Sequence, residues 1–148
     1  MNIAQALKAK NRLAGELNRK QQILSRENAR RSDSVSKIDR ESVWKEIFVL
    51  SEQLGNLKGR ITQANVAIYP MLERMSELKS RISFIESLNK KEGEEIDYYG
   101  RDNQKVTYKW DSFINQEFAD LEISKLQKEI DYLQDKVDAY NATTQIPD

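Results

Sequence analysis

Apolar residues recur in steps of three and four along most of the chain, which is the spacing of one face of an α-helix. The clearest run lies within residues 42–65. Its apolar positions are Val43, Ile47, Leu50, Leu54, Leu57, Ile61 and Ala64. This is the a/d pattern of helices that pair with a left-handed twist. A helix of this length spans roughly 36 Å at 1.5 Å per residue, so we expect an extended helical hairpin or bundle.

The same spacing predicts three further helices, at about 2–29, 70–89 and 115–140. We place a turn between the second and third helices, because a proline disfavours helix at the residue before it and Asn65 suits a left-handed helix end. Ile68 and Met71 nevertheless keep the apolar spacing across Pro70. One long kinked helix is therefore the alternative.

Residues 96–110 change character. Val106, Tyr108 and Trp110 alternate with polar residues, and turn-forming residues lie around Arg101 to Asn103. This pattern predicts a small β-hairpin before the last helix. Two strands alone are marginal in water, so we expect the hairpin to lean on a helix or to pair with another subunit.

These elements define a mainly α protein, a single elongated helical domain over residues 1–148. Short connections make successive helices antiparallel, as in a four-helix coiled-coil-like bundle built from long helical hairpins. That topology gathers polar residues at one pole, which is the best candidate site: Asn65, Asn141, Thr143 and Thr144. The alternative is that these residues are only helix-end caps and a tail clasp.

A second strip on the helix at 42–65 begins with Trp44 and Phe48 and continues roughly through Gly55 and Gly59. Each glycine costs about 1 kcal/mol relative to alanine inside a helix. We interpret them as allowing close approach by another helix. The alternative is a hinge, or a surface that admits a ligand or partner.

The composition excludes many reactions. The chain has no cysteine and no histidine, so disulfides, thiolate nucleophiles, Ser-His-Asp triads and zinc-finger ligand sets are absent from it. The densest carboxylate cluster, around Glu92 to Asp97, has the features of a solvated turn. We therefore expect no enzymatic activity and no cofactor.

The longest uncharged run, 61–72, is shorter than the roughly 20 residues of a membrane-spanning helix, and the opening residues do not resemble a signal peptide. We expect a cytoplasmic protein with no membrane contact.

Charge is balanced overall, with 24 basic and 24 acidic residues, but residues 1–40 are basic and residues 111–148 are acidic. We expect the basic first helix to pack beside the acidic last one. The alternative is a basic face that contacts nucleic acid or another polyanion. Its cations would be Arg19, Lys20, Arg26, Arg30 and Arg31. No aromatic residue is interleaved with them, so such binding would be salt-sensitive backbone electrostatics.

Three segments resemble the septicolysin-like family of small, uncharacterised bacterial helical proteins. The opening Met1–Leu7 is similar to that family's M-x-L-A-x-A-L start, Arg60–Asn65 to its R-I-N-x-T-N segment, and Asn141–Ile146 to its N-W-T-T-x-L ending. Ala142 stands where the family often has tryptophan. Thr62 and Ala64 depart from the pattern as well. The resemblance implies a fold and no established activity.

Unbroken apolar seams drive self-association, so we expect a homo-oligomer, a dimer or higher. The favoured function is a non-enzymatic oligomeric scaffold or protein-interaction module. A nucleic-acid or polyanion binder is the first alternative. A phage or mobile-element factor that binds a host protein is the second.

Overall fold

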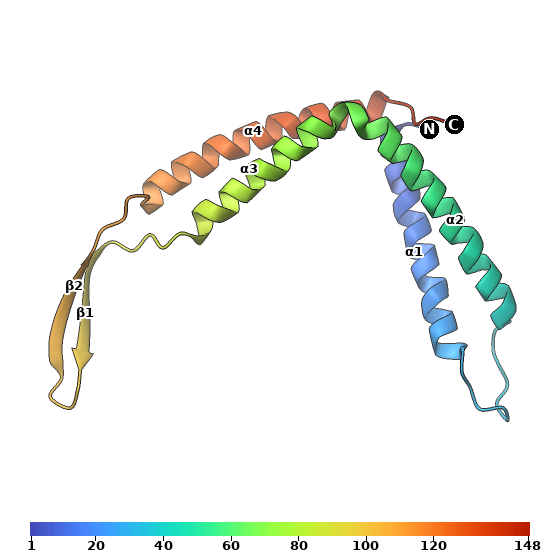
Figure 1. Cartoon of the computed structure of the whole chain (residues 1–148), viewed down its shortest axis with the longest axis horizontal. Coiled ribbons are helices and arrows are strands. Elements are labelled where there is room, and N and C mark those ends of the chain that lie inside the picture. Colours follow the sequence, from blue (N-terminus) through green and yellow to red (C-terminus); the bar gives the residue numbers. More distant parts are fainter. The chain divides into compact units, whose positions relative to one another are not determined.

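The computed structural model describes residues 1–148, and 68% of them are helical. A two-stranded antiparallel hairpin precedes the last helix (Figure 1). The elements are α1 (Ile3–Glu27), α2 (Arg40–Asn65), the 3-10 turn η1 (Val66–Ile68), α3 (Tyr69–Ser87), β1 (Gly93–Tyr99), β2 (Gln104–Trp110) and α4 (Gln116–Thr143). The predicted mainly α class and the hairpin insert are confirmed.

The prediction of four separate helices is wrong, because α2, η1 and α3 follow one another without a break and form one of three continuous helical stretches. Asn65 keeps a right-handed backbone (φ −80°, ψ −8°) rather than the left-handed one expected at a helix end. Pro70 has no N–H for the carbonyl of Val66. In η1 the N–H of Tyr69 donates to that carbonyl instead, so the chain passes the proline while staying helical.

The structure divides into two compact units. The first contains residues 1–69 and 137–148, and the second contains residues 70–136. In the first unit α1 and α2 lie side by side and antiparallel (Figure 1). Lys20 Nζ lies 2.6 Å from Glu46 Oε2, and near the 28–39 connection Arg40 Nη1 donates to the Asn28 carbonyl at 3.0 Å.

The core of the first unit lies at the opposite end of this helix pair. Five buried apolar residues form it: Ile3, Ala6, Leu57, Ile61 and Ile146. Val43 and Leu54 continue the buried seam along α2. The apolar spacing within residues 42–65 therefore identified the buried face of α2 correctly.

The second unit contains α3 from Pro70, the hairpin and the part of α4 up to Lys136. Met75 and Leu78 of α3 and Ala119 and Ile130 of α4 are its buried apolar residues. Arg74 donates two hydrogen bonds to the carboxylate of Glu129, at 2.9 and 3.2 Å.

The hairpin begins earlier than expected, at Gly93 instead of Ile96, and pairs Gly93 with Trp110 and Tyr99 with Gln104. Gly100 (φ 73°) and Asn103 (φ 48°) hold the left-handed conformations of the turn, a role that glycine and asparagine tolerate best. Every residue of β2 is exposed. The hairpin therefore does not pack on a helix of this chain. This was one of our two expectations; the other was pairing with another subunit.

Candidate functional site

Residues from both ends of the chain meet at the core of the first unit, in an arrangement that we call the terminal clasp (residues 1–5, 60–65 and 140–147). Asn2 and Gln145 form an isolated antiparallel bridge. The N–H of Ile3 donates to the Thr144 carbonyl, and the N–H of Ile146 donates to the Met1 carbonyl, both at 3.0 Å. The clasp therefore ties the start of α1 to the segment that follows α4.

Side chains reinforce the clasp. Asn2 and Gln5 form a reciprocal capping box at the start of α1, and Asn2 Nδ2 donates to the Ala142 carbonyl at 3.0 Å. Arg60 Nε donates to the Pro147 carbonyl at 2.6 Å, and the Tyr140 hydroxyl donates to the Ala64 carbonyl at 2.9 Å. All three segments that carry the family resemblance therefore lie in one place.

The four residues of the predicted polar pole all lie in the terminal clasp. Thr143 donates to the Ala139 carbonyl one turn earlier in α4, and Thr144 contributes backbone hydrogen bonds. Asn65 and Asn141 are half-buried, and the Oδ1 atom of each is buried without a hydrogen-bond partner. The two threonines thus form hydrogen bonds at the end of α4 and in the tail, whereas the two amides are incompletely satisfied.

Three of the five residues predicted to contact a polyanion form contacts within the chain. Lys20 pairs with Glu46, Arg31 pairs with Asp33 at 3.0 Å, and Arg30 donates to the Ser34 carbonyl at 2.6 Å. Arg19 and Arg26 are exposed on α1. The helix that lies along α1 is α2, and the observed partner of Lys20 belongs to it.

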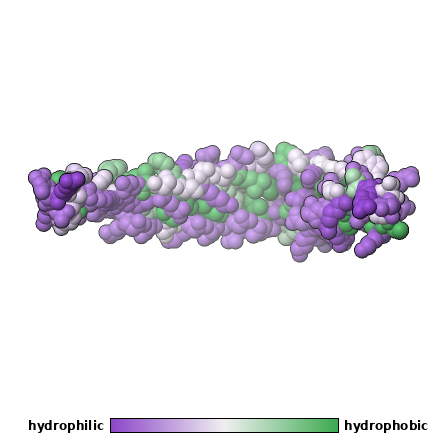
Figure 2. All heavy atoms as spheres, turned by 90° about the horizontal axis from the view of Figure 1, so that it is seen from below, coloured by the Kyte–Doolittle hydropathy of each residue, from purple (hydrophilic) through white to green (hydrophobic).

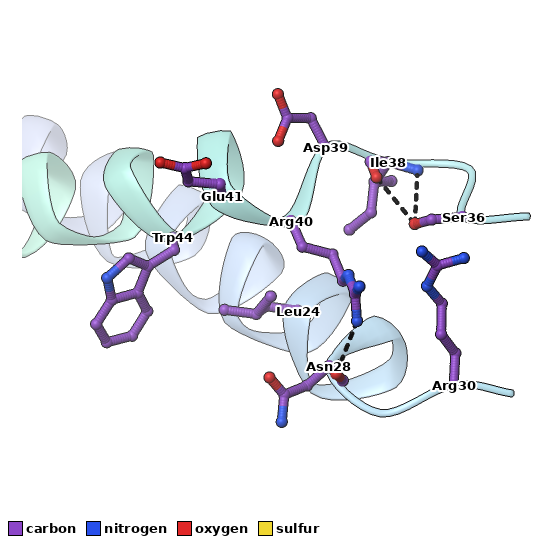
Figure 3. A pocket seen from close by; sticks show the side chains of 9 residues that line it. All are labelled: Leu24, Asn28, Arg30, Ser36, Ile38, Asp39, Arg40, Glu41 and Trp44. Carbon is purple, nitrogen blue, oxygen red and sulfur yellow. Dashed lines mark hydrogen bonds between the residues drawn. The ribbon is translucent and has the colours of Figure 1, made fainter. Parts of the chain in front are cut away.

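An open hollow of about 570 Å³ lies where α1 ends and α2 begins. Figure 3 shows Arg40 reaching back toward Asn28. The lining residues are Leu24, Asn28, Arg30, Ser36, Ile38, Asp39, Arg40, Glu41 and Trp44. The set contains two arginines and two carboxylates, so the hollow carries no excess charge that would attract a polyanion.

The strip that starts at Trp44 and Phe48 is open to solvent. Their exposed fractions are 61% and 62%. A Cβ atom built at Gly55 or Gly59 meets nothing within 4 Å. No helix of this chain approaches these glycines, so the close approach that we expected is not made within the chain.

The hairpin contains Glu95 and Tyr99, two residues whose pKa neighbouring side chains shift. Trp110 Nε1 donates to Glu95 Oε2 at 2.7 Å, and Lys91 also binds this carboxylate. The hydrogen bond from Lys91, then the one from Trp110, lowers the pKa of Glu95. The Tyr99 and Tyr108 hydroxyls lie 3.2 Å apart. This hydrogen bond, with Asp97 nearby, raises the pKa of Tyr99 to about 12.

The structure brings together no group of three acidic side chains that could hold a metal ion. None of its helices combines the length and the apolar character that crossing a bilayer requires. The carboxylates of residues 92–97 belong to β1 and the segment before it, where most residues are exposed.

In comparisons with known proteins, no family model, no curated protein and no solved structure matches the chain. The resemblance to the septicolysin-like family stays a prediction that rests on the three clasp segments.

Proposed function

We propose that the protein is a non-enzymatic helical scaffold or interaction module that works as a homo-oligomer with coiled-coil-like packing. The observation that carries this proposal is the amount of surface the single chain leaves in water. The chain exposes 11206 Å², whereas a compact protein of 17.3 kDa exposes about 7,800 Å². Two separate compact halves would together expose about 9,400 Å². The excess approaches 2,000 Å², the scale of a protein–protein interface.

Much of that exposed surface is apolar. Eighteen large apolar side chains are exposed, compared with thirteen buried apolar residues. Figure 2 shows hydrophobic side chains reaching the surface among hydrophilic ones. Exposed apolar residues are common on any protein, but contiguous patches of them indicate contact surfaces.

The second unit has only one pair of helices, α3 and α4, to bury its seam, and the first has α1 and α2 with only the last turns of α4. In the second unit Ile82, Ile85, Ile123 and Leu126 occupy seam positions and are only half-buried. Two helices cannot enclose a seam on all sides, whereas three or four can. Further copies of the chain would complete the burial that the single chain leaves unfinished.

Size-exclusion chromatography with light scattering tests the proposal, run at low and high salt with the nucleic-acid absorbance recorded. We expect one discrete multimer whose mass does not depend on salt, and a protein-like absorbance. A monomer in both buffers would contradict the proposal. Copurifying nucleic acid that high salt removes would favour the polyanion binder instead, because phosphate contacts weaken steeply as salt rises.

A further inference from the structure

The helical stretch from α2 through η1 to the first residue of α3 has a second face, about a third of a turn away from the seam with α1. We call it the outer face of α2. Its members follow one another in steps of three and four: Trp44, Phe48, Ser51, Gly55, Gly59, Thr62, Val66 and Tyr69. All of them are exposed, and Val66 and Tyr69 retain exposed fractions of 68% and 59%. No other part of the first unit covers this face.

The order of side-chain sizes along the outer face of α2 is the same in both directions. Two large apolar residues stand at the start, Trp44 and Phe48, and two more at the end, Val66 and Tyr69. Small residues fill the middle, and both glycines there have open space around them. Glycine lets a second backbone approach closely, so a second helix can cross at the middle of this face. The large side chains at the two ends can pack against those of the second helix.

The geometry points to a second copy of this chain as the occupant, with the two outer faces packed antiparallel about an axis between Gly55 and Gly59. In this arrangement Phe48 of one copy meets Val66 of the other, and the small middles cross. A parallel pair would match large with large for any order of residues, whereas an antiparallel pair does so only when the order of sizes is the same in both directions, as it is here. Antiparallel helices at close range also oppose their macrodipoles favourably.

The exposed area is sufficient for such a contact. Aromatic side chains carry about 150–250 Å² each. With their exposed fractions, Trp44, Phe48 and Tyr69 therefore present roughly 300–450 Å² per copy, and Val66, which is 68% exposed, adds to this area. Two copies would bury at most about 1,000 Å² from these four side chains, which is where specific interfaces begin. The small residues and the flanking side chains add to that area.

This pairing rests on the proposed self-association and assigns it a surface. The matched test compares Gly55→Arg with Gly15→Arg. Both glycines lie in exposed helix with nothing within 4 Å of an added Cβ, and arginine is a good helix former, so both variants should fold with unchanged helical circular dichroism. Sedimentation equilibrium should show at least tenfold weaker self-association for Gly55→Arg and no change for Gly15→Arg.

Orientation is tested with single cysteines, because the chain has none of its own. Ser51→Cys and Thr62→Cys lie on opposite sides of the proposed axis. In an antiparallel pair the two Ser51 positions are about 18 Å apart along the helices, too far for a disulfide, which needs Cα atoms within about 7 Å. Under mild oxidation a mixture of the two variants should therefore cross-link, and neither variant should do so alone.

The outcomes separate the two proposals. A wild-type chain that is monomeric would overturn both the self-association and this surface. A wild-type multimer that Gly55→Arg leaves intact would overturn the surface alone. Cross-linking of Ser51→Cys by itself would overturn the antiparallel arrangement.

Discussion

Ile146 provides the sharpest test of the terminal clasp, because it is the apolar residue that the segment after α4 contributes to the core. Its side chain is only 6% exposed and packs in the cluster with Ile3, Ala6, Leu57 and Ile61. Changing Ile146 to alanine removes three carbons. At about 0.8 kcal/mol for each buried carbon this loses a little over 2 kcal/mol, and the cavity left behind adds about 1 kcal/mol. We expect the free energy of unfolding to fall by about 3 kcal/mol.

Urea denaturation followed by far-ultraviolet circular dichroism measures this change. With an m-value of about 2 kcal/mol per molar urea, the midpoint of the transition should fall by about 1.5 M. Val35→Ala is the matched control, because Val35 is 92% exposed in the loop between α1 and α2 and its loss should cost less than about 0.5 kcal/mol. If Ile146→Ala shifts the midpoint no more than Val35→Ala does, the clasp does not hold in solution.

Three further changes test other contacts. Asn2→Ala removes the capping box and the hydrogen bond to the Ala142 carbonyl; it should cost about 1 kcal/mol in urea denaturation, and an unchanged midpoint would count against the cap. Gly100→Ala forces a side chain onto a φ of 73° and should destabilise the hairpin by about 1 kcal/mol, seen as lost dispersion of the hairpin amide signals in NMR spectra. Folding raises the pKa of Tyr99 to about 12 from the usual 10, so the hairpin stability that this group provides is complete below pH 10 and is lost as the pH rises toward 12. Tyrosinate absorbance should therefore show one late-titrating hydroxyl that disappears in Tyr99→Phe, and a wild-type curve without that late step would refute the contact.

The sequence was sufficient for the elements whose side chains repeat regularly. In α2 the residues that the spacing places on one face include Val43, Leu54, Leu57 and Ile61, and the structure buries all four. The hairpin was predictable for a similar reason, since strand residues alternate on both sides of a segment rich in turn formers. Local patterns of this kind determine local structure.

The passage over Pro70 was not predictable from local rules. Proline removes one N–H donor, and the usual consequence is a helix end. Here the carbonyl of Val66 is satisfied by Tyr69 one residue earlier, through a 3-10 hydrogen bond. The unbroken apolar spacing of Ile68 and Met71 was the signal that favoured continuity.

That error also hid the full extent of the outer face of α2. Trp44, Phe48 and the two glycines were noted from the sequence, but a turn after Asn65 excludes Val66 and Tyr69 from the same helical face. Because the helix continues through η1 and past Pro70, Val66 and Tyr69 belong to the same face. Only with these two residues included is the order of side-chain sizes the same in both directions.

The four residues of the predicted polar pole, Asn65, Asn141, Thr143 and Thr144, belong to the first unit. The four separate antiparallel helices from which we inferred that pole are not observed. The backbone bridge between Asn2 and Gln145 has no periodic signal in the sequence, because it joins segments from opposite ends of the chain. An isolated apolar residue beyond the last helix, Ile146, was the remaining clue.

The central claim is that the single chain leaves its apolar burial unfinished and completes it with further copies of itself. Native mass spectrometry over a dilution series tests this most directly. The account predicts one discrete assembly at an integer multiple of 17.3 kDa, which dissociates only on strong dilution. A chain that stays at 17.3 kDa at every concentration would contradict it.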